Sequence, residues 1–369
     1  MRWLVASASF GMCLFGGSTT FAEGATLAPV LGLSVTCGES LPALDRVATK
    51  LALRKSRGEP ALDLPDLALA VLAERVPYVW PRAWVASGPS TEALAAGFLA
   101  HQKTLPAATR PVCGRASVDV GNGKVVAAVV VLDAKGELLP VKERARVGEF
   151  LGVEATLNGE ARDARVMVKG PFGAPRTVPG HFDPASRKVR ATFAPDAPGT
   201  FVVQIVADTE RGPRPVLETR VFANVTPTYS RDPREIASPT VAGPADDALF
   251  ALVKKLRQDE GLPALMRDPK LDAVAKAHVE TMIAKQSLAH DTGDGDPRAR
   301  SEEAGIRART IAENLATGRE VLGLHRALTE SPSHHANLRS AALDRIGVAV
   351  VADAKGALWG CEIFAGGNP

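Results

Sequence analysis

Apolar residues recur at the spacing of an α-helix through the Ala/Leu-rich stretch 41–105, as in Leu64, Leu67 and Val71. Positions three and four apart share one face of a helix, so this pattern predicts amphipathic helices. Prolines along the stretch would end or interrupt them. We therefore expect a small helical region over residues 23–115.

Beyond Cys113 the pattern changes to short valine-rich runs separated by turns that contain glycine and proline. The runs cover residues 125–131, 150–157, 164–168, 189–193, 201–206 and 216–225. Short strands at this spacing are typical of all-β folds, so we expect an Ig-like β-sandwich over residues 116–226. Residues 227–244 carry four prolines among Ser, Thr and Asp. This composition predicts an extended linker.

A helical period returns after the linker and gives way to strand-like runs near the C-terminus. Leu249 and Val253 would lie on one helical face, and the strand-like runs cover residues 346–351 and 358–364. Helices followed by strands predict an α+β domain over residues 245–369. The fold class expected for the whole chain is therefore multidomain.

The first 22 residues are typical of a secretory signal. Arg2 supplies a positive charge, residues 3–17 are apolar, and the run that ends at Ala22 resembles a small-x-small cleavage site. We expect cleavage after Ala22 and a secreted or periplasmic protein. Cys13 raises the alternative of a lipid anchor, which is less favoured because the two small residues of a lipobox do not precede it. No other segment approaches the roughly 20 apolar residues of a membrane span.

Composition narrows the function without naming it. The chain has 369 residues, enough for two or three domains, and 46% are hydrophobic and 23% charged, which is typical of globular proteins. Forty-four basic and 41 acidic residues leave a net charge of +3, and aromatic residues make up only 5%. The net charge gives no strong excess of basic residues, and few aromatic residues are available to stack on bases. We therefore expect no nucleic-acid partner.

Three cysteines would remain after export: Cys37, Cys113 and Cys361. An oxidising compartment favours pairing two of them. A bridge between Cys37 and Cys113 would close a long loop within one region. Cys361 would then be a single, buried strand residue.

The histidines gather in the last third of the chain. Five of the seven lie there, namely His278, His290, His325, His334 and His335. The common hydrolase signatures are absent, because there is no G-x-S-x-G element and the run after His278 lacks the second histidine of H-E-x-x-H. A conventional serine hydrolase or zincin is therefore disfavoured.

A series of short elements accompanies these histidines. In chain order they are Gly261-Leu262-Pro263, Ala289-His290-Asp291, Ala312-Glu313-Asn314, Ser331-Pro332-Ser333-His334-His335-Ala336-Asn337-Leu338 and Arg345-Ile346-Gly347-Val348. The order and spacing of the series resemble the bacterial branch of the CAP superfamily (SCP/PR-1-like). The resemblance covers residues 246–364 and implies an α-β-α sandwich with a cleft that holds two histidines and acidic residues.

The resemblance also assigns the site residues. It implies that His290, Glu313 and His334 share the cleft. Ala312 stands where the family often has glycine, His335 where arginine is usual, and His325 where tryptophan is common. The second glutamate of eukaryotic relatives has no clear equivalent, and Glu330 is the nearest candidate.

The residues themselves suggest what His334 could do. Ser331 and Pro332 form an N-cap and first-position pair, which places His334 in the first turn of a helix, near the positive end of its dipole. A charged imidazolium is disfavoured there, and a neutral ring can accept a proton or bind a metal. Two such rings and the Glu313 carboxylate would suit Zn²⁺ with an open position, so we regard His290 and His334 as candidate metal ligands.

Structural roles are the simpler interpretation for the other polar residues. His278 and His325 lie on apolar helix faces and are expected to be packed core residues. Neighbouring helix positions are about 100° apart, so His335 would point away from the cleft toward the surface. Asn314 and Ser331 are expected to support the framework. The acidic loop of Asp291, Asp294 and Asp296 departs from EF-hand order and predicts a solvated turn.

Two functions compete on this evidence. The first is a secreted module that binds a lipid, glycan or protein through the His/Glu cleft. The second is a hydrolase or peptidase in which His334 or Glu313 activates water, with or without a metal. A third hypothesis treats the chain as an envelope component whose C-terminal fold is only a scaffold.

Overall fold

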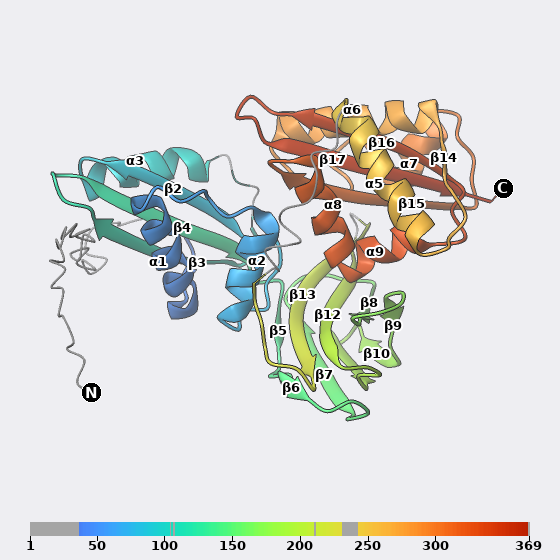
Figure 1. Cartoon of the computed structure of the whole chain (residues 1–369), viewed down its shortest axis with the longest axis horizontal. Helices are drawn as coiled ribbons and strands as arrows, with labels where there is room; N and C mark the ends of the chain where they lie inside the picture. Colours follow the sequence, from blue (N-terminus) through green and yellow to red (C-terminus); the bar gives the residue numbers. More distant parts are fainter. Residues whose placement is uncertain (1–36, 104, 106–107, 210–211, 231–242, 368–369) are drawn as a thin grey trace, which may run out of the picture.

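The computed structural model describes residues 37–103, 105, 108–209, 212–230 and 243–367. The predicted signal segment 1–22 and most of the predicted linker lie outside these residues. Within them the chain forms an N-terminal helix-and-sheet unit, a middle β unit and a C-terminal helix-and-sheet unit (Figure 1). No helix in the described part of the chain is long and apolar enough to cross a membrane.

The N-terminal unit is a four-stranded sheet covered by helices. Its elements are β1 (Glu39–Ser40), α1 (Pro42–Ser56), α2 (Leu64–Ala73), β2 (Arg82–Gly88), α3 (Thr91–Gln102), β3 (Pro111–Asp119) and β4 (Val125–Asp133). The strand order is β1-β3-β4-β2. The predicted helices in this region are confirmed, but the region also contains strands that were not predicted.

Strand β4 explains why this sheet was assigned to the wrong unit. Successive side chains of a strand point to opposite faces, and β4 is apolar at nearly every position. Val126, Ala128 and Val130 pack with α1 and α2, while Ala127 and Val129 pack with α3. Both faces are therefore covered by helices. Placing residues 116–133 in the sandwich was wrong, because a strand with one solvent-facing side would alternate apolar and polar positions.

Close packing and a disulfide hold this unit together. Helix α1 passes so near β3 that a Cβ atom on Gly114 would lie 2.0 Å from the carbonyl carbon of Leu44. Cys37 and Cys113 form the bridge that the sequence suggested. The bridge ties the start of the described chain to β3. Cys361 is a buried free cysteine, as expected.

The middle unit consists of two sheets around one core. Its strands are β5 (Gly136–Leu138), β6 (Arg144–Ala145), β7 (Leu151–Leu157), β8 (Asp163–Lys169), β9 (Arg176–Thr177), β10 (Gly180–Asp183), β11 (Lys188–Phe193), β12 (Gly199–Thr209) and β13 (Gly212–Ala223). The sheets have the orders β10-β11-β7-β5 and β6-β13-β12-β8-β9, and their inward side chains form a single cluster. We keep the Ig-like assignment as a prediction.

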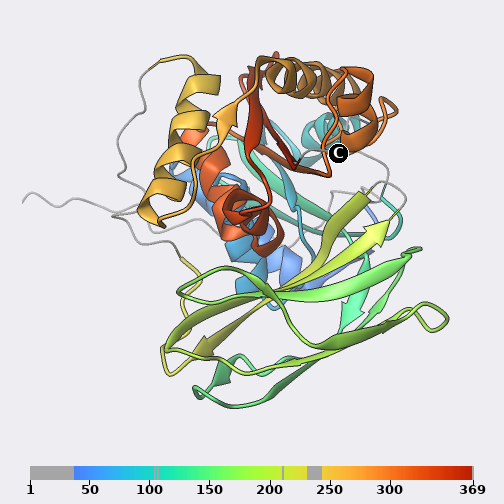
Figure 2. The same cartoon turned by 90° about the vertical axis from the view of Figure 1, so that its right-hand side faces the viewer.

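The C-terminal unit has helices on both faces of a four-stranded sheet (Figure 2). Its elements are α5 (Ala245–Asp259), β14 (Met266–Arg267), α6 (Pro269–Lys285), α7 (Pro297–Glu303), β15 (Thr310–Gly318), α8 (Val321–Glu330), α9 (Pro332–Arg339), β16 (Arg345–Ala352) and β17 (Leu358–Gly366). The strand order is β14-β16-β17-β15. Helix α6 packs on one face, and α5, α8 and α9 pack on the other. These layers are those of the expected α-β-α sandwich.

Alternation along β17 separates the two layers. Trp359, Cys361 and Ile363 face α6, whereas Phe364 packs in the cluster of α5, α8 and α9. Strand β15 pairs with β17 so that Glu313 lies opposite Ile363. The next residues along each strand therefore point to the other face. This alternation determines on which face of the sheet each polar residue of the site lies.

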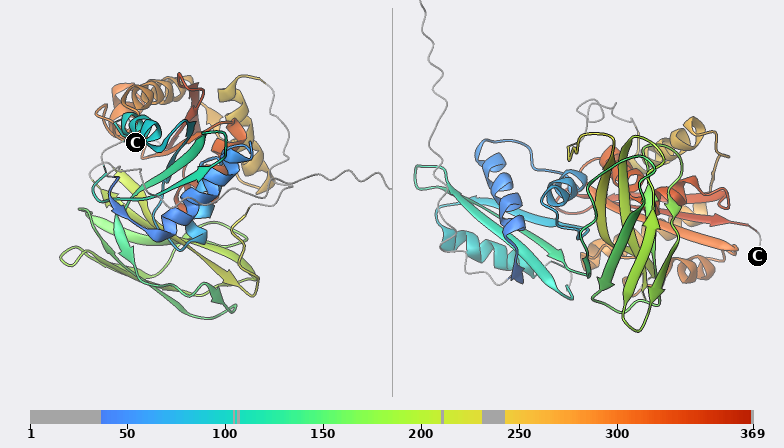
Figure 3. Two further views of the ribbon diagram at one scale, coloured as in Figure 1. Left: turned by 90° about the vertical axis from the view of Figure 1, so that its left-hand side faces the viewer. Right: turned by 90° about the horizontal axis from the view of Figure 1, so that it is seen from below.

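The middle unit lies against the C-terminal unit (Figure 3), and its strands β8 and β12 contact α9, the helix that carries His334. Gln204 of β12 is buried, and its Oε1 accepts a hydrogen bond from the backbone N–H of Ser333 at 3.2 Å. Its Nε2 donates to Ser331 Oγ at 3.3 Å. Ser331 occupies the predicted N-cap position, but its own side chain makes no capping bond. A side chain of another unit thus accepts a hydrogen bond from one of the N–H groups at the start of α9 that have no partner within the helix.

The contact at Gly114 yields a stability prediction. Gly114→Ala should destabilise the N-terminal unit by about 1–3 kcal/mol or more, because the added methyl group would force α1 away from β3. Faster hydrogen exchange of the β3 and β4 amides, measured by mass spectrometry, would report this loss. Gly152→Ala is the matched control, since a Cβ atom there meets nothing within 4 Å. Equal exchange in the two variants would contradict the packing described here.

Candidate functional site

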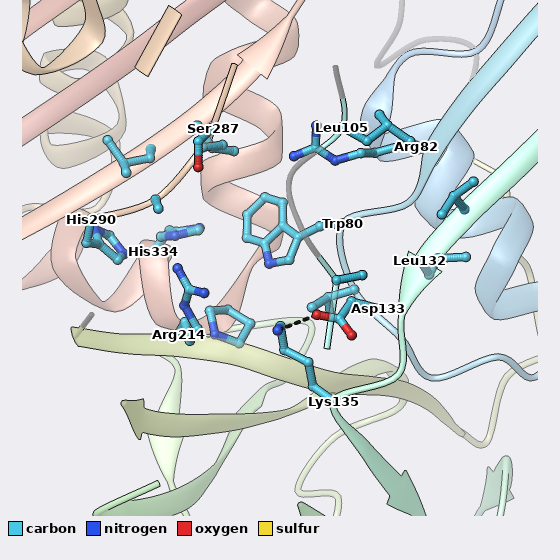
Figure 4. A pocket seen from close by; sticks show the side chains of 17 residues that line it. Trp80, Arg82, Leu105, Leu132, Asp133, Lys135, Arg214, Ser287, His290 and His334 are labelled. Carbon is cyan, nitrogen blue, oxygen red and sulfur yellow. Dashed lines mark hydrogen bonds and ion pairs between the residues drawn. The ribbon is translucent and has the colours of Figure 1, made fainter. Parts of the chain in front are cut away.

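A pocket of about 180 Å³ lies where the three units meet (Figure 4). Each unit contributes side chains to its wall. They include Trp80 and Arg82 from the N-terminal unit, Arg214 and Pro215 from β13, and Ser287, His290 and His334 from the C-terminal unit. Two of the three predicted site residues, His290 and His334, therefore face the same space.

His334 lies in the first turn of α9 and is almost completely buried, with 4% of its surface exposed. Burial, with a smaller contribution from His290, lowers its pKa to about 3. The ring is therefore neutral, as the sequence suggested, and the main cause of the lowered pKa is burial rather than the helix dipole. The ring of Trp80 lies over it, with 5.9 Å between ring centroids.

Glu313 lies behind His290 rather than in the pocket wall. It is 5% exposed, and its Oε1 accepts a hydrogen bond from His290 Nδ1 at 2.8 Å. Its Oε2 accepts from Arg300 Nη2 at 2.5 Å. Burial alone would raise the pKa of Glu313, but the His290 hydrogen bond and the nearby positive charges outweigh it and lower the pKa. The carboxylate is thus ionised and held from both sides.

This arrangement does not fit the three-ligand zinc site that the sequence suggested. Zinc would need a carboxylate oxygen of Glu313, and both oxygens already accept hydrogen bonds from protein groups. Within the described part of the chain, no group of three His, Cys, Asp or Glu side chains could hold a metal ion. The suggestion that His290 and His334 bind a metal stays a prediction.

Two important residues of the site escaped the sequence argument. Arg300, at 7% exposure, also donates from Nη1 to the backbone oxygen of His290 at 2.8 Å. No pattern in the sequence assigned a role to Arg300. Trp80 belongs to a different unit, and no local pattern connects its position to His334. Its backbone has a φ of 62°, a conformation that is uncommon for a bulky residue.

A second polar group lies beneath α9, on the other face of the sheet. Asn314 donates from Nδ2 to Glu362 Oε2 at 2.9 Å, and its Oδ1 accepts from Asn337 Nδ2 at 2.9 Å. Glu362 is fully buried, and its other oxygen has no hydrogen-bond partner. Burial, opposed by the Asn314 hydrogen bond, raises its pKa to about 7. The framework role expected for Asn314 fits these contacts.

The remaining histidines differ from one another. His278 is buried as expected, with Nδ1 2.6 Å from Asp294 Oδ2 and Nε2 3.0 Å from the backbone oxygen of Ala289. His325 is also buried. The prediction that His335 is exposed was wrong, because α9 packs against the middle unit and leaves this ring 7% exposed.

The acidic residues outside the His pocket also have local roles. Asp294 contacts His278, and Asp296 accepts from the N–H of Ala299 to cap α7. The loop is therefore tied to the fold more firmly than a solvated turn. Glu330 lines an adjoining apolar hollow instead of the His pocket, so it does not complete the expected cleft.

The comparison with known families agrees with this architecture. The family model described as "CAP: Cysteine-rich secretory protein family" matches residues 250–363. The C-terminal unit is a CAP domain. No curated protein matches the chain.

Solved structures give weaker likenesses. An outer surface protein from Borrelia burgdorferi is 23% identical, with a TM-score of 0.32, over 34% of this chain and 93% of that one. An extracellular protein with an SCP domain from Bacillus anthracis is 14% identical, with a TM-score of 0.31, over 63% and 86%. A cysteine-rich secretory protein from Staphylococcus aureus is 13% identical, with a TM-score of 0.29, over 62% and 86%. The family match, rather than these scores, assigns the CAP domain.

The buried ion pair of the CAP domain can be tested by removing its cation. Arg300→Met should destabilise the domain by roughly 3–5 kcal/mol, because it leaves the Glu313 charge buried with less compensation. Adding Glu313→Gln should recover part of that loss. The readout is hydrogen exchange of the β15 and β17 amides. Arg319→Met, at an exposed site, is the control. Unchanged hydrogen exchange in Arg300→Met would refute the ion-pair assignment.

Glu362 should make the stability of the CAP domain depend on pH. The pKa of Glu362 is higher in the folded chain than the ordinary value near 4.5. Its contribution to the free energy of unfolding is therefore fully present below about pH 4.5 and is lost as pH rises through about 7. Glu362→Gln should therefore gain melting temperature relative to wild type between pH 4.5 and 8. Exposed Glu280→Gln should show no such trend. A constant difference between Glu362→Gln and wild type would show that Glu362 does not titrate in this range.

Proposed function

We propose that the chain is an exported ligand-binding protein whose CAP-domain pocket holds a small molecule against His290 and His334. One observation carries the proposal: both rings line a pocket that residues of the two other units help to enclose. Enclosure by apolar side chains with a few polar groups is the usual form of a small-molecule site.

Export rests on two further features. The residues from Met1 to Ala22 have the pattern of a secretory signal, and Cys37 and Cys113 are bridged. Disulfides persist in oxidising compartments and are rare in the cytosol. These features support a secreted or periplasmic location.

Binding is favoured over hydrolysis by the state of the polar groups. Both oxygens of Glu313 are engaged, so this carboxylate is poorly placed to activate water. Among the described residues no hydroxyl group is hydrogen bonded to the ring of His290 or His334. The alternative, a hydrolase or peptidase, draws on one feature, because a histidine oriented by a carboxylate through Nδ1 can serve as a general base through Nε2.

A fragment screen tests the binding role. A library of small fluorinated fragments, followed by ¹⁹F NMR on the full mature chain, should give hits that compete with one another. Ala108→Phe, which fills the pocket from its wall, should abolish them. Ala185→Phe, on an exposed turn of the middle unit, should keep them. If no hit is sensitive to Ala108→Phe, this pocket is not a binding site.

The hydrolase alternative is tested on the same preparations. Peptide and ester libraries incubated with wild type and His290→Ala should remain intact when followed by mass spectrometry. Cleavage that disappears in His290→Ala but persists in Ala185→Phe would replace the binding proposal with the hydrolase.

A further inference from the structure

One end of the middle unit carries exposed apolar side chains. Phe150 and Phe172 are the most exposed large apolar residues in the described part of the chain, with 81% and 79% of their surface accessible. Val147 and Val225 are also exposed, so this end holds four of the eight exposed large apolar side chains among the described residues. Single exposed apolar residues are common on soluble proteins, whereas a group of them on one surface indicates an interaction site.

These side chains belong to one continuous surface, which we call the tip. The tip consists of residues 146–150, 170–175, 194–198 and 224–225. The backbone N–H of Gly148 donates to the carbonyl oxygen of Pro195 at 2.8 Å and joins the first of these segments to the third. A Cβ atom on Gly199 would lie 2.7 Å from the side chain of Pro171, so residues 170–175 pack against the start of β12. Strands β6 and β13 are parallel neighbours, which brings the segments that follow them side by side.

The acidic residues of the tip are compensated. Residues 170–175 contain no charged side chain, and the other three segments contain two acids, Glu149 and Asp196. Glu149 lies 2.5 Å from Lys142 Nζ, and Asp196 lies 3.2 Å from Arg176 Nη1. Neither carboxylate therefore leaves an uncompensated negative charge on this surface.

Two basic residues border the tip without such compensation. Arg144 ends the approach along β6, and Arg146 begins the first segment of the tip. Both are exposed, and no ion pair joins either side chain to a described residue. The neighbouring acid, Glu143, is paired with Arg75. The tip thus combines projecting aromatic side chains with a positive border.

This combination is suited to a lipid bilayer with acidic headgroups. Aromatic side chains enter the boundary between headgroups and acyl chains, and basic residues beside them are attracted to anionic lipids. Phe150 and Phe172 project into solvent instead of lining a hollow, so a peptide or a small molecule would find little enclosure there. A bilayer needs no such enclosure, because its lipids rearrange around an inserted ring.

We propose that the tip attaches the protein to an anionic lipid bilayer. Phe150 and Phe172 insert at the headgroup boundary, and Arg144 and Arg146 contact acidic headgroups. This inference gives the middle unit a function of its own and does not depend on the pocket of the CAP domain.

Vesicle flotation tests the proposal on the full mature chain. The protein should float with vesicles of phosphatidylcholine and phosphatidylglycerol in equal amounts, and should bind vesicles of phosphatidylcholine alone at least about 10-fold more weakly. Phe150→Ser and Phe172→Ser should each weaken binding about 10-fold, because each removes an apolar group that leaves water. A chain with both Arg144→Gln and Arg146→Gln should bind the anionic vesicles about 10-fold more weakly, with unchanged binding to phosphatidylcholine.

Matched variants control for changes elsewhere on the surface. Met266→Ser removes an apolar side chain of the CAP domain that is 67% exposed, and it should leave flotation unchanged. A chain with both Arg162→Gln and Arg187→Gln, two exposed sites at the opposite end of the middle unit, should also behave as wild type. Thermal unfolding confirms that each variant is folded. Phe172→Trp should add fluorescence that lipids with brominated acyl chains quench, which reports insertion directly.

Three results would overturn the proposal. The first is absence of flotation with anionic vesicles, or flotation that survives both serine substitutions. The second is equal binding to the two kinds of vesicle, which would exclude attraction to acidic headgroups. The third is a dimer in light scattering that Phe150→Ser abolishes, together with no flotation, which would assign the tip to a contact between two copies of the chain.

Discussion

The geometry of the site depends on keeping one negative charge inside the CAP domain. Glu313 projects from the central sheet into a region with almost no access to water, where an isolated carboxylate would be very unfavourable. Arg300 and His290 compensate it through direct hydrogen bonds. Because Arg300 also holds the backbone of His290, one buried charge fixes both the ring and the loop that carries it. His290 thus reaches the pocket in a defined orientation, with Nδ1 already engaged.

His334 is positioned from outside its own domain. The start of α9 has no capping side chain of its own, and Gln204 of the middle unit accepts the N–H of Ser333 instead. Trp80 of the N-terminal unit covers the ring. The burial that keeps this histidine neutral therefore includes a contribution from residues that a separate CAP domain would lack. The two rings face one pocket for different reasons, His290 through an internal charge and His334 through packing between units.

Much of the CAP domain could be predicted from the sequence, because local rules act there. Helical periods, the Ser331-Pro332 start of α9 and the positions of His290, Glu313 and His334 all follow from spacing and from the family pattern. The N-terminal unit was harder, since β4 was assigned from its valine content, which sandwich strands and strands covered by helices share, and not from its lack of alternating polar positions. Local sequence contains no information on which unit covers α9. The burial of His335 and the contact of Trp80 with His334 were therefore out of reach.

The difference between contacts within the CAP domain and contacts between units also affects the selectivity of the pocket. His290 and His334 belong to the CAP domain, where the ionised Glu313 and the buried Glu362 leave little freedom for substitution. Arg82 and Arg214 belong to the other two units and lie outside the CAP core, whereas Trp80 also covers His334. Substitutions of the two arginines can alter the charge presented to a ligand while the two rings stay in place. The two histidines and the residues that can vary are thus held by different units of the chain.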